Sequence, residues 1–278
     1  MKSLTITAAF VLVLAGFVPA LHAAASPAAP IQTTNSDVTA RRRALNDLFA
    51  QYWEDRLSHS PEFASSIGDK RFNDQLTDYS VDAYNQQLAR GRDFLARLGQ
   101  IDTTGLSDQE ILSKDLLVRE LIDQLKESRF KPWEMPVNQF SGLQLSLPQL
   151  VARLSFTSAK DYDDYIARLN KVPTAFHQIT DNMLTGVDDR RVPPKYLLEK
   201  VLVQVNAIAA QKPEDSPFAR PLKKFPADLS AADQTRIHDE VLAAIAKQVI
   251  PAYQRFARFL QAAYIPAGRT DPGVWSLP

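Results

Sequence analysis

The side chains best suited to metal binding or proton transfer are four histidines, which are scattered along the chain. His22 lies near the N-terminus and His59 precedes a proline, whereas His177 and His238 fall within segments of helical pattern. A helical zinc site of the H-E-x-x-H type needs two histidines four residues apart, so that both face the metal. Neither His177 nor His238 has such a partner. We therefore predict no metal ligands in this chain, with a zinc site assembled from distant residues as the minor alternative.

Paired carboxylates are the other candidates for acid–base chemistry, and they occur at Asp163-Asp164 and Asp188-Asp189. Catalytic pairs need two carboxyl groups that face each other in a pocket, but adjacent residues of a helix point in different directions. Arginines stand close to both pairs, so ion pairs on solvated faces are the favoured interpretation. The nucleophile motif G-x-S-x-G and glycine-rich phosphate loops are absent. From the residues alone, the sequence predicts no catalytic centre.

The composition limits the class of protein. Of the 278 residues, 45% are hydrophobic, which suffices for one large or two modest domains with a core. Lys and Arg total 32, as do Asp and Glu, so no excess positive charge is present to bind nucleic acid. Cysteine is absent, which excludes disulfides, cysteine-ligated zinc, thiol catalysis and a lipid anchor on a processed cysteine. We expect no nucleic-acid partner.

The N-terminal segment has the pattern of a cleavable secretory signal over residues 1–25. Lys2 gives a positive start, an apolar run follows, and small residues end the segment. The run is shorter than the roughly 20 residues that a membrane span needs, so we expect no span after cleavage. Residues 26–37 are rich in Pro, Ala, Thr and Ser and are predicted to form a flexible tether. The expected location is the periplasm or the outside of the cell.

The remaining residues, 38–278, are predicted to form one all-α lobe. Apolar residues recur at helical spacing, and no alternating strand pattern or fixed repeat is present. Helices are expected from Val38 to Ser58, from Ser60-Pro61 to Gly68, after Ser80, after the capping box at Ser107, after Pro193-Pro194 and after Ser230. The helix after Ser230 is expected to continue through Pro251 with a kink. The stretch from Pro213 to Pro226 is expected to be irregular.

One irregular crossing, expected over residues 131–146, interrupts the helices. Two prolines and Gly142 lie among apolar residues there, and proline removes a backbone donor while glycine loosens the chain. Helices are predicted to restart at Ser146 and again at Ser158, and Pro173 is predicted to begin a further helix. The predicted fold is therefore a multi-helix array with a single Pro/Gly crossing.

Four sequence motifs occur in an order that is typical of a known family. They are PEFASSIGD at 61–69, PVNQFSG at 136–142, TSAKDYDDYIARLNKVP at 157–173 and AYIPAGRTDPGVWSLP at 263–278. Through them the chain, from about Val38 to Pro278, resembles the bacterial family known as domain of unknown function 885. Members of that family are mostly exported and look like helical zinc metallopeptidases of the gluzincin type.

The resemblance implies that this chain corresponds to the N-terminal half of such a protein. Family members are much longer, and their H-E-x-x-x-G-H-like zinc motif follows the point where this sequence ends. Zinc is thus implied for the full-length family, with its ligands and general base in a C-terminal half. No cofactor is expected in this chain, and no catalytic residue is carried over to it. A peptide would be the substrate of the completed protein.

Asn138, Gln139 and Tyr264 are the residues that the resemblance suggests for a substrate cleft shared with the missing half. Asn138 and Gln139 belong to the crossing, and Tyr264 lies at the exit from the last helix. In the alternative interpretation, Asn138 and Gln139 only satisfy backbone groups of an irregular segment. This alternative is favoured over a role in a cleft.

Three functions are consistent with the sequence. The leading hypothesis is the N-terminal lobe of an exported zinc-metallopeptidase-like protein, inactive alone because no ligated metal activates a water, with a C-terminal catalytic half as its partner. The second is a self-contained periplasmic helical binding or scaffold protein. The third, favoured least, is a stand-alone hydrolase that combines carboxylates with His177 or His238.

Overall fold

The computed structural model describes residues 35–278, and this part of the chain is all-α. Its helices are α1 (Asn35–His59), α2 (Pro61–Ser66), α3 (Val81–Gly99), α4 (Asp108–Glu127), α5 (Leu143–Val151), α6 (Ala159–Asp188), α7 (Lys195–Ala209), α8 (Ala231–Ala244) and α9 (Ile250–Phe259). Residues 35–278 contain no β-strand, and Pro194 and Arg269 form an isolated bridge. The predicted fold class is confirmed.

The predicted signal over residues 1–25 lies outside the described residues, as does most of the predicted tether over residues 26–37. The last three residues of that tether already belong to α1, which begins at Asn35 rather than at Val38. The side chain of Thr39 donates a hydrogen bond to the backbone oxygen of Asn35 at 2.9 Å. Asp37 lies in the first turn, where a negative charge interacts favourably with the helix dipole.

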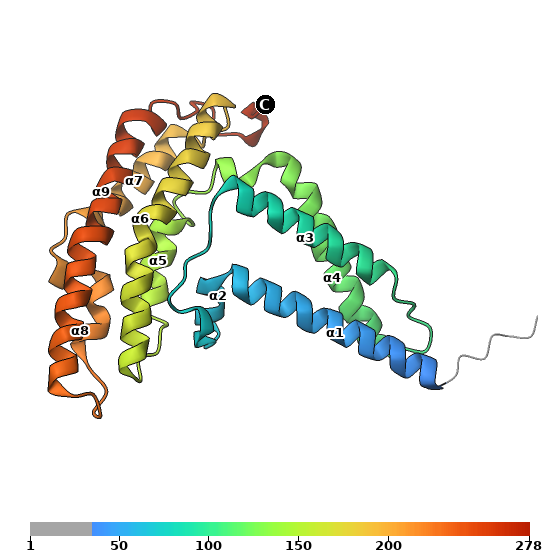
Figure 1. The fold of residues 1–278 in the computed structure, drawn as a ribbon. Coiled ribbons are helices and arrows are strands. Elements are labelled where there is room, and N and C mark those ends of the chain that lie inside the picture. Colours follow the sequence, from blue (N-terminus) through green and yellow to red (C-terminus); the bar gives the residue numbers. More distant parts are fainter. Residues whose placement is uncertain (1–34) are drawn as a thin grey trace, which may run out of the picture.

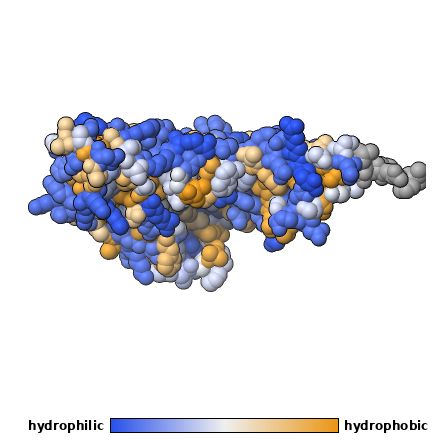
Figure 2. Space-filling model, turned by 90° about the horizontal axis from the view of Figure 1, so that it is seen from below, coloured by the Kyte–Doolittle hydropathy of each residue, from blue (hydrophilic) through white to orange (hydrophobic). Residues whose placement is uncertain are grey.

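The helices form two groups with separate hydrophobic cores (Figure 1). Helices α1, α3 and α4, here called the arm, pack around Leu45, Leu48, Phe94, Leu98, Leu106, Leu117 and Leu121. Helices α5–α9, here called the bundle, enclose a larger core that includes Tyr162, Phe176, Met183, Val201, Ile237, Tyr253 and Phe256. In Figure 1 the bundle stands at the left and the arm projects from it to the right. Seen from below, most of the surface is hydrophilic, with apolar residues in small separate patches (Figure 2).

Serine caps set the starts of four helices, as the sequence predicts. Ser80, Ser107 and Ser230 accept hydrogen bonds from the backbone amides of the first turns of α3, α4 and α8, and Ser158 does the same for α6. Ser107 also forms a complete capping box with Glu110. Hydrogen bonds to Glu110 from Arg42 and then from Ser107 lower the pKa of this carboxyl to about 2. The capping signals were therefore reliable guides to helix starts.

The crossing is shorter than predicted, because α5 begins at Leu143 and not at Ser146. Gly142 adopts φ 127°, a conformation that residues with side chains rarely reach. A Cβ atom at this position would clash with the side-chain oxygen of Gln144 and would lie 3.2 Å from the Cα atom of Val137. The turn into α5 thus depends on a glycine, and Ser146 lies inside the helix.

The prediction that Pro173 begins a helix is wrong, because α6 runs without a break from Ala159 to Asp188. Proline inside a helix removes one backbone hydrogen bond and crowds the preceding turn. Here apolar side chains on both sides of Pro173 hold the helix in the core, among them Leu169, Val172 and Phe176, each at most 3% exposed. Burial of this face outweighs the local preference of proline.

The last long segment is continuous, as predicted, but its irregularity takes the form of π-helical turns. A π-helix at Ile245–Val249 separates α8 from α9, and Pro251 lies in the first turn of α9. A second π-helix, Leu260–Tyr264, follows α9. The predicted irregular stretch contains two 3₁₀ segments, Pro213–Asp215 and Pro217–Lys223. None of the helices described in residues 35–278 is long and apolar enough to cross a membrane.

Candidate functional site

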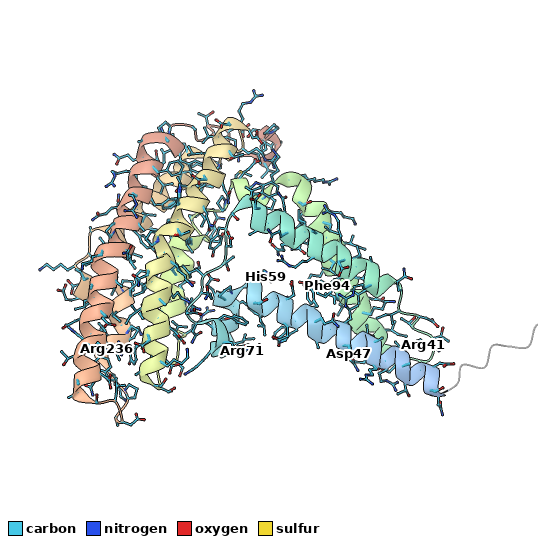
Figure 3. The ribbon with its side chains drawn as sticks, viewed as in Figure 1. Arg41, Asp47, His59, Arg71, Phe94 and Arg236 are labelled. Atoms are coloured by element: carbon cyan, nitrogen blue, oxygen red, sulfur yellow. The ribbon has the colours of Figure 1, made fainter. Side chains whose placement is uncertain are left out.

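A cavity of about 960 Å³ opens where the arm meets the bundle. Its lining side chains come from the end of α1, residues 75–80, α3, α4, the crossing and two positions of α6, Ile179 and Asn182. Residues 75–80 connect the short α2 region to α3, and they line the cavity together with these two α6 positions. Figure 3 shows His59 and Phe94 in the space between α1 and α3, where the cavity lies.

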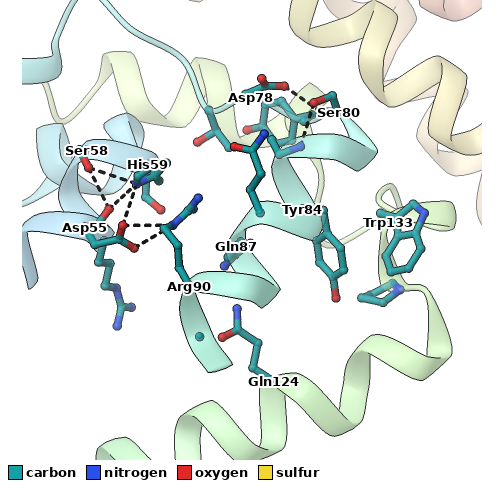
Figure 4. Close-up of a pocket in the computed structure, with 18 of the residues that line it drawn as sticks. Asp55, Ser58, His59, Asp78, Ser80, Tyr84, Gln87, Arg90, Gln124 and Trp133 are labelled. Atoms are coloured by element: carbon teal, nitrogen blue, oxygen red, sulfur yellow. Dashed lines mark hydrogen bonds and ion pairs between the residues drawn. The ribbon is translucent and has the colours of Figure 1, made fainter. Parts of the chain in front are cut away.

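One side of the cavity carries a network of ion pairs between α1, α3 and α4. Asp55 lies 3.1 Å from Nε of Arg90, and its carboxylate lies 3.4 Å from Nδ1 of His59. Arg56 pairs with Glu120 at 3.3 Å. Each basic group on this side therefore already has an acidic partner, as the dashed lines around Asp55 in Figure 4 illustrate.

The opposite side of the cavity is aromatic. Tyr84 of α3 and Trp133 of the crossing lie with their ring centroids 4.5 Å apart and their planes tilted by 45°. Both rings are half-buried, and Pro132 and Pro136 line the cavity beside them. Burial, followed by the charge of nearby Glu127, raises the pKa of the Tyr84 phenol. This end can offer apolar ring faces and a carboxylate to a ligand.

The wall next to the bundle is held by polar side chains of α6. The amide nitrogen of Tyr79 donates to Oε1 of Gln178 at 3.0 Å, and Gln178 Nε2 donates to Asp78 at 2.8 Å. Asn182 donates to the backbone oxygen of Tyr79 at 2.7 Å. Arg168, only 2% exposed, donates to the backbone oxygen of Gln75 at 2.7 Å. These bonds fix the backbone of residues 75–80 against α6.

None of the three residues predicted for a substrate cleft lines this cavity. Oδ1 of Asn138 accepts hydrogen bonds from the backbone amides of Phe140 and Ser141 at 2.8 and 2.9 Å. This arrangement corresponds to the alternative interpretation of Asn138, in which the side chain satisfies local backbone groups. A role for Asn138 in a cleft shared with a further segment stays a prediction.

Gln139 belongs to the crossing, whereas Tyr264 packs against it from the π-helix that follows α9. The backbone oxygen of Gln139 accepts a hydrogen bond from Gln204 of α7 at 3.0 Å. Tyr264 is fully buried, and its hydroxyl donates to the backbone oxygen of Glu134 at 3.5 Å. Tyr264 therefore packs beneath the surface against the crossing, and its side chain is not accessible to a ligand in the described part of this chain.

Among the residues singled out in the sequence, His22 lies outside the described residues, and ion pairs are formed by His59, His177, His238, Asp163, Asp164 and Asp189. Nδ1 of His177 lies 3.4 Å from Asp181, and Asp163 lies 2.9 Å from Arg236. Within residues 35–278, no group of three His, Cys, Asp or Glu side chains is placed to hold a metal ion. The described residues therefore do not fit the zinc that the family resemblance implies, and no hydrolytic step is assigned to them.

The cavity was not apparent in the sequence, although one signal pointed toward it. Trp133 lies among the prolines of the crossing, where the sequence predicts no helical face to bury it. Other lining side chains, such as Tyr84 and Gln87, lie on α3. The apolar stripe of that helix indicates only the face that packs in the arm. The meeting of these elements depends on tertiary structure.

The comparisons with known proteins place the chain in a family. Residues 61–275 match the family described as bacterial protein of unknown function, DUF885. This chain belongs to the DUF885 family. The matched range begins after α1, so it is narrower than the resemblance recognised from the motifs. A search of curated proteins found no match.

Two solved structures share the fold of this DUF885 chain. One is a "putative lipoprotein" from Colwellia psychrerythraea, with a TM-score of 0.77 and 17% identity, over 86% of this chain and 44% of that one. The other is a "putative lipoprotein of unknown function" from Shewanella oneidensis, with a TM-score of 0.58 and 16% identity, over 80% of this chain and 37% of that one. The present chain thus spans less than half the length of either structure.

Proposed function

We propose that this DUF885 chain is the peptide-binding lobe of an exported, metallopeptidase-like protein. The observation that carries the proposal is the cavity of about 960 Å³ between arm and bundle. Its volume lies at the upper end of the range of pockets that enclose small ligands, and its lining combines apolar surface with a few polar groups, as binding sites do. The cavity can accept a short stretch of extended peptide.

The lining offers the hydrogen bonds that a peptide backbone needs. Gln86, Gln87 and Gln124 line the cavity, and their side-chain amides form no hydrogen bond within residues 35–278. Each amide can donate and accept at once, which matches the alternating N–H and C=O groups of a peptide. Gln87 and Gln124 lie between the ion pairs and the aromatic end in Figure 4. A peptide laid between the two ends would pass these amides.

Hydrolysis is assigned to a segment outside this chain. In the proposal, zinc ligands and the general base belong to a C-terminal half, as the family resemblance implies. The solved relatives support this division because each extends well beyond the region that this chain matches. The lobe described here would bind and orient the peptide, while the second half would supply the activated water.

Exposed apolar side chains that could dock that half lie on the crossing, on α7 and near the C-terminus. Phe140 of the crossing is 85% exposed, Val203 of α7 is 69% exposed, and Trp275 near the C-terminus is 80% exposed. The elements that carry them are joined, because Gln204 binds the crossing and the backbone of Lys195 pairs with that of Arg269. Large exposed apolar side chains of this kind mark interaction surfaces. The proposed occupant is the C-terminal half of a DUF885 protein.

A second candidate function is a self-contained helical binding protein of the periplasm. It is favoured by the hydrophobic cores of the arm and of the bundle, which are built from described residues of this chain and flank the cavity. The two candidates differ in one measurable respect. A binding protein leaves bound peptide intact and needs no second half, whereas the lobe of a peptidase cleaves its ligand when the second half is added.

The test compares two tryptophan substitutions on α3. Gln87 lines the cavity, whereas Asn85 is exposed on the same helix outside it. The purified chain is dialysed against a casein digest, and the retained peptides are identified by mass spectrometry. We expect Gln87→Trp to reduce retention at least tenfold by filling the cavity, and Asn85→Trp to leave it unchanged. Equal retention by both variants, or none by the wild type, would refute the proposal.

A further inference from the structure

We propose that the aromatic end of the cavity binds a cationic group of the ligand, either a free α-ammonium group or a Lys or Arg side chain. This inference rests on the proposed function, because it assigns a chemical preference to the same cavity. It is carried by the placement of two aromatic rings and one unpaired carboxylate, all of which line the space.

The rings of Tyr84 and Trp133 provide the first part of the site. They come from α3 and the crossing and lie close together on one side of the cavity, away from Asp55 and Arg90 (Figure 4). Tryptophan and tyrosine have the ring faces to which ammonium and guanidinium groups bind best, because the face of the π system is negative. Neither ring has a protein cation over it, whereas four other aromatic rings of the described chain, including that of Phe94, do.

Glu127 provides the second part. It is the last residue of α4, it lines the cavity, and within residues 35–278 it forms no ion pair with Lys, Arg or His. The carboxyl end of a helix is the negative end of its dipole, so this position also favours a cation. Glu127 lines the same cavity as Tyr84 and Trp133, and its charge, after burial, contributes to the raised pKa of the Tyr84 phenol. A cation between them would gain both interactions.

The charges of the lining favour a cation over an anion. Arg90 is matched by Asp55, and Arg56 is matched by Glu120. His59 also contacts Asp55. Asp78, Glu127 and Asp123 remain. Asp78 accepts hydrogen bonds from Gln178 and from the amide of Ser80, and Asp123 is only loosely paired, at 3.7 and 4.0 Å from its basic neighbours. A ligand carboxylate would have to displace Asp55 from Arg90, whereas a ligand cation meets a carboxylate without a partner.

Four short peptides separate the possible sources of the charge. They are Ala-Lys-Ala-Ala-amide, its N-acetyl form, and the same two peptides with norleucine in place of lysine. Norleucine keeps most of the apolar stem and lacks the charge. The N-acetyl norleucine peptide carries no positive charge. We expect calorimetric titration of the full chain to show that it binds at least about tenfold more weakly than Ala-Lys-Ala-Ala-amide, which carries two. The peptide that retains affinity with only one charge identifies the α-ammonium or the side chain as the bound group.

Three variants test the residues. Glu127→Gln removes the charge at constant shape and Trp133→Leu removes the ring face. Both are expected to shrink the difference between charged and neutral peptides below about threefold. Asp115→Asn is the matched control, because Asp115 is an exposed carboxylate of α4 outside the cavity. It is expected to keep the full difference.

The outcomes distinguish this inference from the proposed function. Equal affinity for all four peptides would overturn the cationic preference and leave peptide binding in place. If no peptide binds, the proposed function fails, and the cation site is judged separately with tetramethylammonium chloride. That ion is expected to shift the indole NMR signal of Trp133 in the wild type but not in Glu127→Gln, and the absence of a shift would overturn the inference.

Discussion

Arg168 and Ser65 are 103 residues apart in the sequence, yet Nη2 of Arg168 donates to Oγ of Ser65 at 2.7 Å inside the protein. The same guanidinium donates to the backbone oxygens of Phe72 and Gln75, at 2.8 and 2.7 Å. Burial lowers the pKa of Arg168, because removing its positive charge from water is unfavourable. Hydrogen bonds to the three oxygens offset this cost. Arg168 thereby joins α6 to the segment that forms the cavity wall.

Replacing Arg168 with methionine should therefore loosen the cavity wall as well as destabilise the fold. The substitution leaves the backbone oxygen of Gln75 without its donor and removes one of the two donors to the Phe72 oxygen, which still accepts from the amide of Gln75 at 3.0 Å. We expect this loss to cost about 2 kcal/mol in the free energy of unfolding. Urea denaturation measures this loss, and hydrogen exchange should show lower protection for residues 72–79. Arg153→Met, at an exposed position, is the control. Unchanged exchange in Arg168→Met would contradict this account.

The contact between Lys70 and Asp161 should make stability depend on pH in the acid range. Burial raises the pKa of Asp161, but hydrogen bonds from Lys70, Thr157 and Ser158 outweigh that effect and lower it to about 2. Because the folded pKa lies below the unfolded one, this stabilisation is present above about pH 4 and is lost as the pH falls toward 2. Asp161→Asn should therefore cost about 2 kcal/mol at pH 7 and little near pH 2.

Urea unfolding of both proteins across this pH range measures the difference. Asp163→Asn is a suitable control, because Asp163 pairs with Arg236 at the surface, where both side chains are at least 40% exposed. Exposed pairs contribute little to stability. A gap between wild type and Asp161→Asn that stays constant from pH 7 to pH 2 would refute the assigned role of Lys70.

Two glycines in helices should respond in opposite ways to alanine. A Cβ atom at Gly186 of α6 would lie 2.6 Å from the backbone oxygen of Glu134 and 2.9 Å from that of Arg191. Gly186→Ala should therefore destabilise the protein by about 2 kcal/mol despite the better helix propensity of alanine. Gly99 has no atom within 4 Å of the same position, so Gly99→Ala should stabilise by up to ~1 kcal/mol. Thermal unfolding of the two variants checks the contrast.

Pro173→Ala distinguishes the observed helix from the predicted one. Inside α6, proline costs a backbone hydrogen bond, so alanine should stabilise the protein by about 1 kcal/mol or more. At the first position of a helix, as the sequence predicts, the same change would bring no such gain, because proline is favoured there. Chemical denaturation at neutral pH decides between these outcomes.

The sequence predicts the local features of this fold well and the contacts between distant segments poorly. Serine caps and apolar stripes are properties of neighbouring residues, so the starts of α3 and α4 could be predicted. Pro173 misled the prediction because its helix is held by tertiary burial, which a local pattern does not include. The start of α5 was missed because Gly142, not Ser146, makes the turn.

The cavity could not be predicted from local sequence patterns either, because it is formed by segments that are distant in the sequence. Trp133 and Tyr84 are 49 positions apart, and their meeting depends on how the crossing packs against α3. Asn138 and Gln139 are predicted for a substrate cleft only through the family resemblance, with the satisfaction of local backbone groups as the favoured alternative. The structure shows that Oδ1 of Asn138 is occupied by the backbone of Phe140 and Ser141.

Side chains of α6 bind backbone groups of residues 72–79, which form the cavity wall next to the bundle, through hydrogen bonds. Because these bonds go to the main chain, most side chains that face the cavity contribute little to holding arm and bundle together. Substitutions at Gln87 or Gln124 therefore carry little cost in folding. Such a separation means that the shape and charge of the lining can change by substitution while the scaffold that surrounds the cavity keeps its fold.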